Sequence, residues 1–275
     1  MKKFIFLIIK FLAFVMFINI VFGMVLIKTD WNVKSTVSFF HGNQENIEIL
    51  VLGNSLGMDG IDADLISNAT GLNCYNACIE GGSVNDALFR FQYALKNNDI
   101  STVILASNID YLSDCGRKHI VTEGFSRKSF IFQNHLSKYH GFHIGVVKKI
   151  VSEKHRKSLI VKGQLRYDNL YLDNSELKYV SKECNLERLS CYESMVELAE
   201  RNSVDLIFVN MPLFKERRHI LNAETINCNL INLNGPSIEN IINPKVHFGS
   251  VNHLNTQGAR VLTLKLLELT DGLFR

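Results

Sequence analysis

Short apolar runs alternate along this chain with segments whose apolar residues recur at helical spacing. The clearest runs cover residues 48–52, 72–76, 102–106 and 205–210. Such runs are typical of strands that are buried on both faces of a parallel sheet. Helical spacing marks residues 84–96, 186–200 and 256–269, and Asp62 begins an earlier helical segment. The alternation predicts an α/β fold, a three-layer sandwich with a central parallel sheet and right-handed crossovers.

Three residues with groups suited to chemistry lie where predicted strands end or the next helix begins: Ser55, Gly82 and Asn108. Ligands of such sheets bind at the carboxyl ends of the strands, so we expect these residues to come together. The middle of the chain, about residues 113–180, has mixed periodicity, and within it residues 130–136 and 145–151 have helical character.

The amino-terminal segment differs from the rest of the chain. Residues 4–27 are almost entirely apolar and follow Lys2 and Lys3. At about 1.5 Å per residue, this run is long enough to cross a bilayer. A cleaved signal peptide and a buried helix are the alternatives, but a signal peptide has a shorter apolar region and a small-residue cleavage site. We therefore expect residues 1–28 to be a single-pass membrane anchor, with residues 29–45 as a linker and the remainder on the extracytoplasmic side.

Charge is distributed unevenly. Residues 116–168 hold twelve Lys or Arg and three acidic residues, a net charge of +9, in a chain whose total is +3. One interpretation is a solvated insertion, and the other is a basic surface that faces anionic headgroups or an acidic polysaccharide. A domain outside the cytoplasm would not meet nucleic acid, so nucleic acid is not expected as a partner.

The six cysteines do not decide the redox compartment. Cys74 and Cys78 have a C-x3-C spacing, and Cys184 and Cys191 lie close together, but neither pair forms a zinc pattern with histidine. We expect most of them to be small buried side chains, with one disulfide as an alternative if the domain is extracytoplasmic. No metal site is predicted.

Ser55 is the first candidate for chemistry, because it follows Gly53 and Asn54 directly after a predicted strand. A serine hydroxyl needs a neighbouring base to become a nucleophile, and a turn from strand to helix exposes it beside backbone N–H groups. The alternative is a turn in which the serine caps a helix. The second candidate is His253, whose imidazole can accept and return a proton near neutral pH.

These residues lie in segments that resemble the motifs of the SGNH (GDSL-like) hydrolase family. Residues 49–55 are similar to the first motif, and residues 248–259, Phe-Gly-Ser-Val-Asn-His-Leu-Asn-Thr-Gln-Gly-Ala, are similar to the last. The resemblance covers about residues 46–112 and 203–272. It implies a flavodoxin-like SGNH domain over residues 46–275, with a basic insertion at about 113–180. It also implies that Ser55 is the nucleophile and His253 the base.

The resemblance further implies an oxyanion hole made by Ser55, Gly82 and Asn108. The sequence departs from the family pattern at three positions: Asn54 and Ala106 replace an aspartate and a glycine, and Ser250 stands where the family aspartate precedes the histidine. A neutral hydroxyl can orient an imidazole but cannot stabilise its charged form. A carboxylate from elsewhere, such as Asp110, a backbone carbonyl, or a Ser-His dyad could replace the missing acid.

The layout of an anchor, a Leu-Gly-x-Ser motif and a terminal His-Leu-Asn is most similar to members linked to O-acylation of cell-surface polysaccharides. It implies an extracytoplasmic serine esterase or O-acyltransferase, with acetyl as the simplest group, acting on an acylated glycan without a cofactor. The alternative is a non-catalytic glycan-binding or assembly subunit that partners a membrane acyltransferase. Loss of the family aspartate at Ser250 favours this alternative.

Overall fold

The computed structural model describes residues 2–29, 38–40, 46–113, 115, 159–162, 164–166, 178–183, 190–214, 216–221, 229–235, 238, 240–250, 252–270, 273 and 274. The chain contains two compact units. One comprises residues 1–43 and 123–156, and the other comprises residues 44–122 and 157–275.

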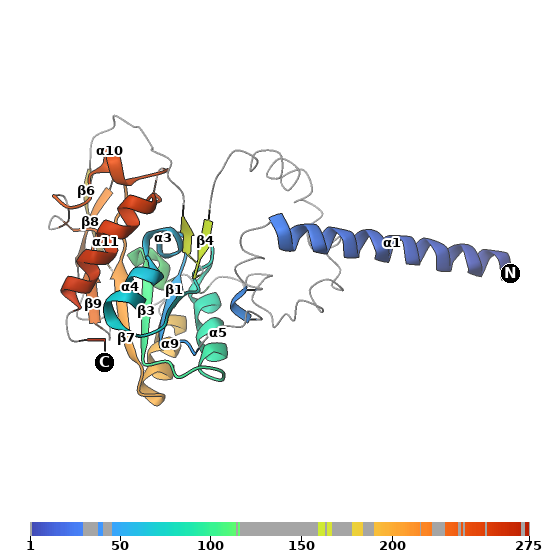
Figure 1. Ribbon diagram of the computed structural model, residues 1–275, viewed down its shortest axis with the longest axis horizontal. Helices are drawn as coiled ribbons and strands as arrows, with labels where there is room; N and C mark the ends of the chain where they lie inside the picture. The colour runs from blue at the N-terminus through green and yellow to red at the C-terminus, as the bar shows by residue number, and fades with distance from the viewer. Residues whose placement is uncertain are drawn as a thin grey trace. The chain divides into compact units, whose positions relative to one another are not determined.

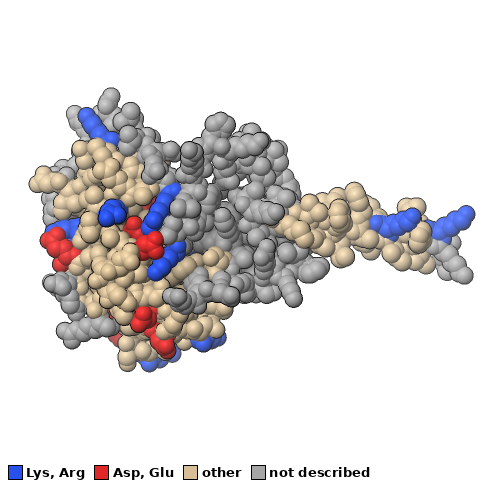
Figure 2. Space-filling view, in the orientation of Figure 1, with Lys and Arg blue, Asp and Glu red and all other residues tan. Residues whose placement is uncertain are grey.

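Within the first unit, a single long helix, α1 (Lys2–Thr29), contains the apolar amino-terminal run. The segment Lys3–Val21 is long and apolar enough to cross a membrane, a property that a signal sequence shares. Its large apolar side chains are exposed, for example Phe4 at 67% and Leu7 at 68%, so they are not covered as in a core helix. Figure 2 shows basic but no acidic side chains along the described part of this helix.

In the second unit, a five-stranded parallel sheet forms the centre (Figure 1), in the order β2-β1-β3-β7-β9. Its strands are β1 (Ile49–Gly53), β2 (Cys74–Asn76), β3 (Thr102–Ser107), β7 (Asp205–Asn210) and β9 (Asn229–Asn232). If these five strands are numbered 1 to 5 along the chain, their order in the sheet is 2-1-3-4-5. This is a doubly wound arrangement whose topological switch point lies between β1 and β3. The predicted α/β sandwich with a central parallel sheet is confirmed.

Alternate residues of the central strands face two separate helical layers. Ile49, Val51, Ile104 and Ala106 belong to one buried cluster. That cluster also includes residues of α3 (Ser55–Gly60), α4 (Ala63–Thr70) and α11 (Thr256–Leu269). Helices α5 (Val84–Ala94) and α9 (Ser190–Arg201) pack against β1 and β7 respectively and against each other. Because the strands are buried on both faces, they show no alternation of apolar and polar residues.

Local capping explains where several helices begin. The Asp62 side chain caps α4 by accepting a hydrogen bond from the Leu65 N–H at 3.1 Å. Ser83 and Asp86 form a reciprocal capping box at the start of α5. Asn255 caps α11 by accepting from the Gly258 N–H. Each of these side chains satisfies a backbone donor that has no partner inside its helix.

Several described elements were not predicted from the sequence. Helix α3 occupies six residues where a simple turn was expected, and β9 completes the sheet. Smaller elements are β4 (Leu159–Val161) with β5 (Gln164–Arg166), β6 (Lys178–Glu183) with β8 (Glu216–Leu221), the 3-10 helix η1 (Ile109–Ser113) and α10 (Pro244–His247). The expected helical character of residues 130–136 and 145–151 lies outside the described residues.

The described cysteines fall into two kinds. Cys115 and Cys191 form a disulfide that joins the segment after η1 to helix α9. Cys74 and Cys78 are free and buried, and burial raises the pKa of both thiols above the ordinary value. Protonated buried thiols are poor nucleophiles and poor metal ligands, so these two residues act as packing groups, as predicted. Cys184 and Cys228 lie outside the described residues.

Gly53 should tolerate no side chain. Its φ is +142°, and an added Cβ would lie 2.0 Å from the carbonyl oxygen of Ala106. We expect Gly53→Ala to lower the free energy of unfolding by about 3 kcal/mol or more, because backbone strain and a steric clash add. Chemical denaturation of the full chain in detergent measures the loss.

Gly71→Ala is the matched control. Gly71 also has a positive φ, +76°, but nothing lies within 4 Å of the added Cβ. Its cost should be that of the left-handed backbone alone, about 1–2 kcal/mol. Equal losses in the two variants would contradict the close approach of Gly53 to the Ala106 carbonyl.

Candidate functional site

Ser55 lies at the switch point of the sheet, where β1 passes directly into α3. Asn54 is the N-cap of α3, and its side-chain oxygen accepts a hydrogen bond from the Leu56 N–H at 3.0 Å. Ser55 is the first residue of the helix and is partly exposed. The capping role therefore belongs to Asn54, which leaves the Ser55 hydroxyl for other contacts.

His253 is held in a loop by the residues that surround it in the last motif. Phe248 and Leu254 form an isolated β-bridge, and the Gly249 N–H donates to the His253 carbonyl at 2.9 Å. The Asn255 side chain donates to the Val246 carbonyl at 2.8 Å while it caps α11. The loop is thereby closed at its base.

The glycine of the same motif, Gly258, is needed for the packing of two helices. An added Cβ would lie 2.2 Å from the His247 carbonyl oxygen, so helix α11 can approach α10 only without a side chain there. His247 has a structural role. Its Nδ1 accepts a hydrogen bond from the Asn243 N–H at 3.0 Å, and burial lowers the pKa of its imidazole.

The His253 ring contacts a carboxylate that the sequence analysis did not identify. Its Nδ1 lies 2.5 Å from Oδ2 of Asp59, a residue of α3 that is 4% exposed. Asp59 follows Ser55 by four residues, which is about one helical turn, so the two residues lie on the same side of α3. The helix that begins with Ser55 thus also carries the group that binds His253.

Opposing effects act on the pKa of His253. Burial lowers it, whereas the hydrogen bond and the charge of Asp59, together with the charge of Glu80, raise it, and the result is a pKa above the ordinary value of 6.5. Glu80 lies on the turn that follows β2. A hydrogen bond from the Ile79 N–H to the Gly53 carbonyl, at 3.0 Å, joins this turn to the end of β1. Glu80 therefore raises the pKa of His253 through its charge, from the turn that follows β2.

Two further residues were expected to form an oxyanion hole with Ser55. Gly53 pairs with Ala106 in the parallel register of β1 and β3, so Ser55 and Asn108 each lie two residues beyond that pair. Among the described residues, no hydrogen bond uses the side-chain amide of Asn108. The Gly82 N–H, by contrast, donates to the Ile79 carbonyl at 3.0 Å and so already has a partner.

Ser250 does not take the place of the family aspartate on the ring. In the described part of the chain, its hydrogen bond is made by its backbone N–H, which donates to the His253 carbonyl at 3.4 Å. Asp110, the other carboxylate considered from the sequence, lies in η1. The carboxylate that the structure places on His253 is Asp59.

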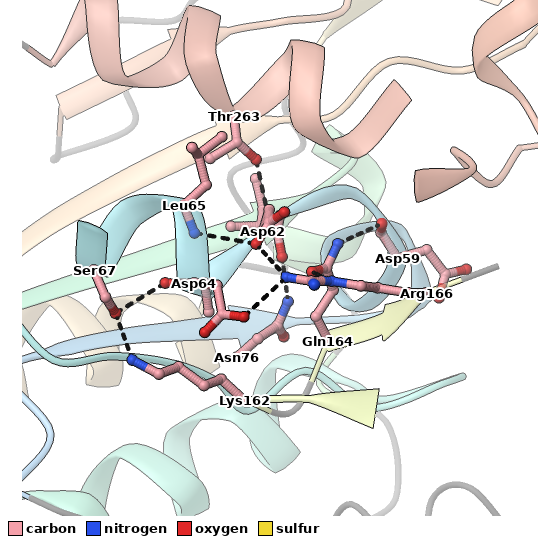
Figure 3. A network of polar contacts seen from close by, with 12 residues as sticks. Asp59, Asp62, Asp64, Leu65, Ser67, Asn76, Lys162, Gln164, Arg166 and Thr263 are labelled. Atoms are coloured by element: carbon pink, nitrogen blue, oxygen red, sulfur yellow. Dashed lines mark hydrogen bonds and ion pairs between the residues drawn. The ribbon is translucent and has the colours of Figure 1, made fainter. Parts of the chain in front are cut away.

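A network of polar contacts holds helix α3 in place (Figure 3). The buried Asn76 side chain donates to the carbonyls of Gly57 and Ile61, at 2.9 and 3.0 Å, and accepts from the Cys78 N–H at 3.1 Å. Its own N–H donates to the Lys162 carbonyl, which connects β2 to the β4–β5 hairpin. The position of α3 therefore depends on side chains from the sheet edge and the hairpin.

The hairpin contributes charged groups to the same network. Arg166 contacts Asp62 at 2.7 Å and Asp64 at 3.2 Å, and the Gln164 side chain donates to the Asp59 carbonyl at 3.5 Å. Lys162 donates to the Ser67 hydroxyl at 2.9 Å. Two of the twelve basic residues in the 116–168 region are thus engaged within the domain.

Asp59 could have been found from the sequence only after α3 had been recognised as a helix. Its spacing of four from Ser55 then places both residues on one side. Two glycines in this six-residue helix weaken the helical signal. Among the described residues, no group of three His, Cys, Asp or Glu side chains is arranged to hold a metal ion.

In this doubly wound α/β domain, Ser55 begins α3 just beyond the carboxyl end of β1, and His253 contacts Asp59 on the same helix. Among the described residues, no hydrogen bond joins the Ser55 hydroxyl to the His253 ring. No family model matches the sequence, and no curated protein matches it. Three similar solved structures are a protein described as an acylhydrolase from Bacteroides fragilis, one described as a platelet activating factor from Streptococcus pneumoniae, and a GDSL-like lipase from Bacteroides thetaiotaomicron.

The similarity extends over most of each chain at low identity. The Bacteroides fragilis protein is 12% identical, with a TM-score of 0.43 and coverage of 90% of this chain and 99% of its own. The Streptococcus pneumoniae protein is 11% identical, with a TM-score of 0.44 and coverage of 92% of this chain and 98% of its own. The Bacteroides thetaiotaomicron lipase is 10% identical, with a TM-score of 0.41 and coverage of 87% of this chain and 97% of its own.

Asn76→Asp tests whether the hydrogen bonds from the Asn76 side chain hold α3 in place. A carboxylate cannot donate to the carbonyls of Gly57 and Ile61, so we expect a loss of about 2–4 kcal/mol in the free energy of unfolding. Asn73→Asp is the control: aspartate retains the side-chain oxygen that accepts from Lys162, and the donor it loses, to the Asn46 carbonyl, is in an exposed bond that water can replace. A comparable loss in both variants would contradict a specific role for Asn76. Denaturation curves measure both.

The pKa values of His253 and of His247, which directly precedes the last motif, should be shifted in opposite directions. NMR titration of the full chain, with ring-labelled histidine in detergent, should give a pKa above 6.5 for His253 and below 6.5 for His247. Because the protonated His253 ring is favoured by folding, its contribution to stability is complete below about pH 6.5 and is lost as the pH rises through the folded-state pKa. A His253 pKa below that of His247 would contradict the described environments.

Proposed function

We propose that the domain is a serine esterase or O-acyltransferase in which Ser55 is the nucleophile and His253 the base. The observation that carries the proposal is that the His253 loop is docked, through a 2.5 Å contact, on the helix that Ser55 begins. Two segments 198 residues apart in the sequence thereby meet at the switch point of the sheet, the usual place for a ligand in this fold.

The proposed reaction begins when the His253 Nε2 accepts the Ser55 proton while Oγ bonds to the ester carbonyl carbon. The ring then returns that proton to the departing alcohol, which leaves an acyl group on Ser55. Water or a sugar hydroxyl releases the acyl group by the reverse sequence. The Ser55 N–H and the Asn108 amide are the donors best placed to stabilise the oxyanion. The scheme needs no cofactor.

The proposed substrate is an acylated cell-surface glycan, with acetyl as the simplest group. Support comes from the resemblance of the Leu-Gly-x-Ser and His-Leu-Asn motifs to polysaccharide-modifying members of the SGNH family. Excess positive charge in residues 116–168 also favours an anionic partner, either an acidic polysaccharide or lipid headgroups.

The proposed location is the extracytoplasmic side of a membrane, with α1 as a single-pass anchor. Lys2 and Lys3 at its amino terminus favour a cytoplasmic start. The disulfide between Cys115 and Cys191 supports this location, because such bonds persist in oxidising compartments. An acyltransferase embedded in the same membrane would then be a natural partner.

A second candidate function is a non-catalytic glycan-binding or assembly subunit. The observation in its favour is that the Gly82 N–H, assigned to the oxyanion by resemblance, already donates to the Ile79 carbonyl. A site short of one oxyanion donor would lose transition-state stabilisation while it could still bind a glycan.

Ser55→Ala tests the catalytic proposal. A fluorophosphonate probe should label the purified full chain, and the substitution should abolish labelling because the attacking oxygen is gone. Ser101→Ala is the matched control. Its hydroxyl donates to the Glu48 carbonyl at the amino end of β3, away from the carboxyl edge, so labelling should remain.

Labelling that persists in Ser55→Ala would remove Ser55 from the nucleophile's role. The second candidate function predicts a different result, in which the unmodified chain shows neither labelling nor ester hydrolysis. Glycan binding measured by calorimetry would then remain intact in a Ser55→Ala, His253→Ala double variant.

A further inference from the structure

We propose that Asp59 is the carboxylate that positions His253 and stabilises the charged form of its ring. This proposal rests on the proposed function, since it assigns a third group to the Ser55–His253 pair. Asp59 would be a positioning residue, because it acts on the substrate through the imidazole. It replaces the aspartate that the family resemblance places at residue 250, where this chain has serine.

The geometry of the contact fits this role. Oδ2 of Asp59 lies 2.5 Å from Nδ1 of His253, which is close enough for a direct, charge-assisted hydrogen bond. Asp59 is 4% exposed and the His253 side chain is 30% exposed, so water screens the pair less than it would at the surface. A carboxylate on Nδ1 fixes the neutral ring with its proton on that nitrogen and leaves Nε2 to accept the serine proton.

Helix α3 determines which ring nitrogen meets which group. Ser55 and Asp59 are separated by four residues, so the nucleophile and the carboxylate face the same direction at a spacing of one turn. The two nitrogens of an imidazole flank one ring carbon, and their hydrogen-bonding directions point away from each other. A ring that binds Asp59 through Nδ1 at one turn of the helix can therefore present Nε2 toward the preceding turn, where Ser55 begins the helix.

The backbone around Asp59 is held independently of His253. The carbonyls of Gly57 and Ile61, on either side of it, accept hydrogen bonds from the buried Asn76 side chain, and the Asp59 carbonyl accepts from Gln164. Figure 3 shows Asn76, Gln164 and Asp59 in this network. A carboxylate on a fixed backbone can orient a ring without itself being reoriented during the reaction.

Other groups near the ring cannot serve as well. The Ser250 hydroxyl is neutral, and in the described part of the chain the recorded hydrogen bond of that residue uses its backbone N–H. Glu80 is exposed and acts on the ring through its charge. The charged groups that influence His253 are thus Asp59 and Glu80, and of these Asp59 makes the hydrogen bond.

The proton inventory balances with Asp59 ionised throughout. When Ser55 Oγ bonds to the carbonyl carbon, its proton moves to Nε2, and the ring becomes an imidazolium whose Nδ1–H donates to Asp59. When the bond to the alcohol breaks, Nε2 returns the proton to the leaving oxygen. The carboxylate neither gains nor loses a proton, so its contribution is orientation and charge.

Asp59→Asn removes the charge at almost constant size and is the main test. We expect ester hydrolysis, measured with p-nitrophenyl acetate on the full chain in detergent, to lose about 10²- to 10⁴-fold in kcat/KM. The pKa of His253, measured by NMR, should fall by about 1 pH unit or more. Activity requires the neutral ring, so any residual activity should begin to rise at lower pH than in the unmodified chain.

Asp64→Asn is the matched control. It removes the same charge from the neighbouring helix, where the carboxylate pairs with Arg166 and does not contact the His253 ring. It should leave the His253 pKa unchanged. A double variant, Asp59→Asn with Ser250→Asp, should restore a raised His253 pKa by returning a carboxylate to the family position.

The tautomer of the ring gives a test that needs no substitution. Nitrogen chemical shifts of the unmodified chain, at a pH above the His253 pKa, should show the proton on Nδ1. A proton on Nε2 would overturn the proposal, as would an Asp59→Asn variant that remains folded with an unchanged His253 pKa. An unmodified chain with no ester turnover would refute the proposed function alone, because the pKa and tautomer measurements do not depend on turnover.

Discussion

Strand β1 at Gly53 and helix α3 at Gly57 both lie so close to Ala106 of β3 that neither position has room for a side chain, and the arrangement of the site depends on this contact. An added Cβ would lie 2.0 Å from the Ala106 carbonyl oxygen at Gly53 and 2.5 Å from it at Gly57. Two glycines therefore let β1 pass into a helix that rests on the neighbouring strand. Ser55 lies between them, at the edge where parallel strands of this topology expose their ligands.

The parts of the fold that could be predicted from the sequence are those with a local signal. The apolar runs of β1, β3 and β7 and the periodic spacing of α5, α9 and α11 are confirmed by the structure. Strand β9 escaped prediction because its four residues begin and end with asparagine, and only two apolar residues lie between them. Its place in the sheet comes from pairing with β7, which is a tertiary contact.

The candidate site shows the same division. Ser55 and His253 could be located because each lies in a motif whose neighbours have a clear structural reason, such as Asn255 at the cap of α11 and Gly258 against α10. Asp59 could not, because its contact with His253 joins residues 194 positions apart. The spacing of four from Ser55 can place Asp59 on one side of α3, but it does not show that His253 meets it there. The serine at residue 250, where the family pattern has aspartate, shows that a carboxylate is missing from this loop. It does not indicate which other residue supplies one.

A carboxylate on α3 changes what the His253 loop has to do. With an aspartate three residues before the histidine, acid and base would share one loop, and their contact would survive a shift of that loop as a whole. With Asp59 as the partner, the contact forms only when the loop docks on α3, so one interaction both orients the ring and brings it to the helix of Ser55. Closure of the loop by the Phe248–Leu254 bridge and the Asn255 side chain would then serve the proposed chemistry as well as the fold.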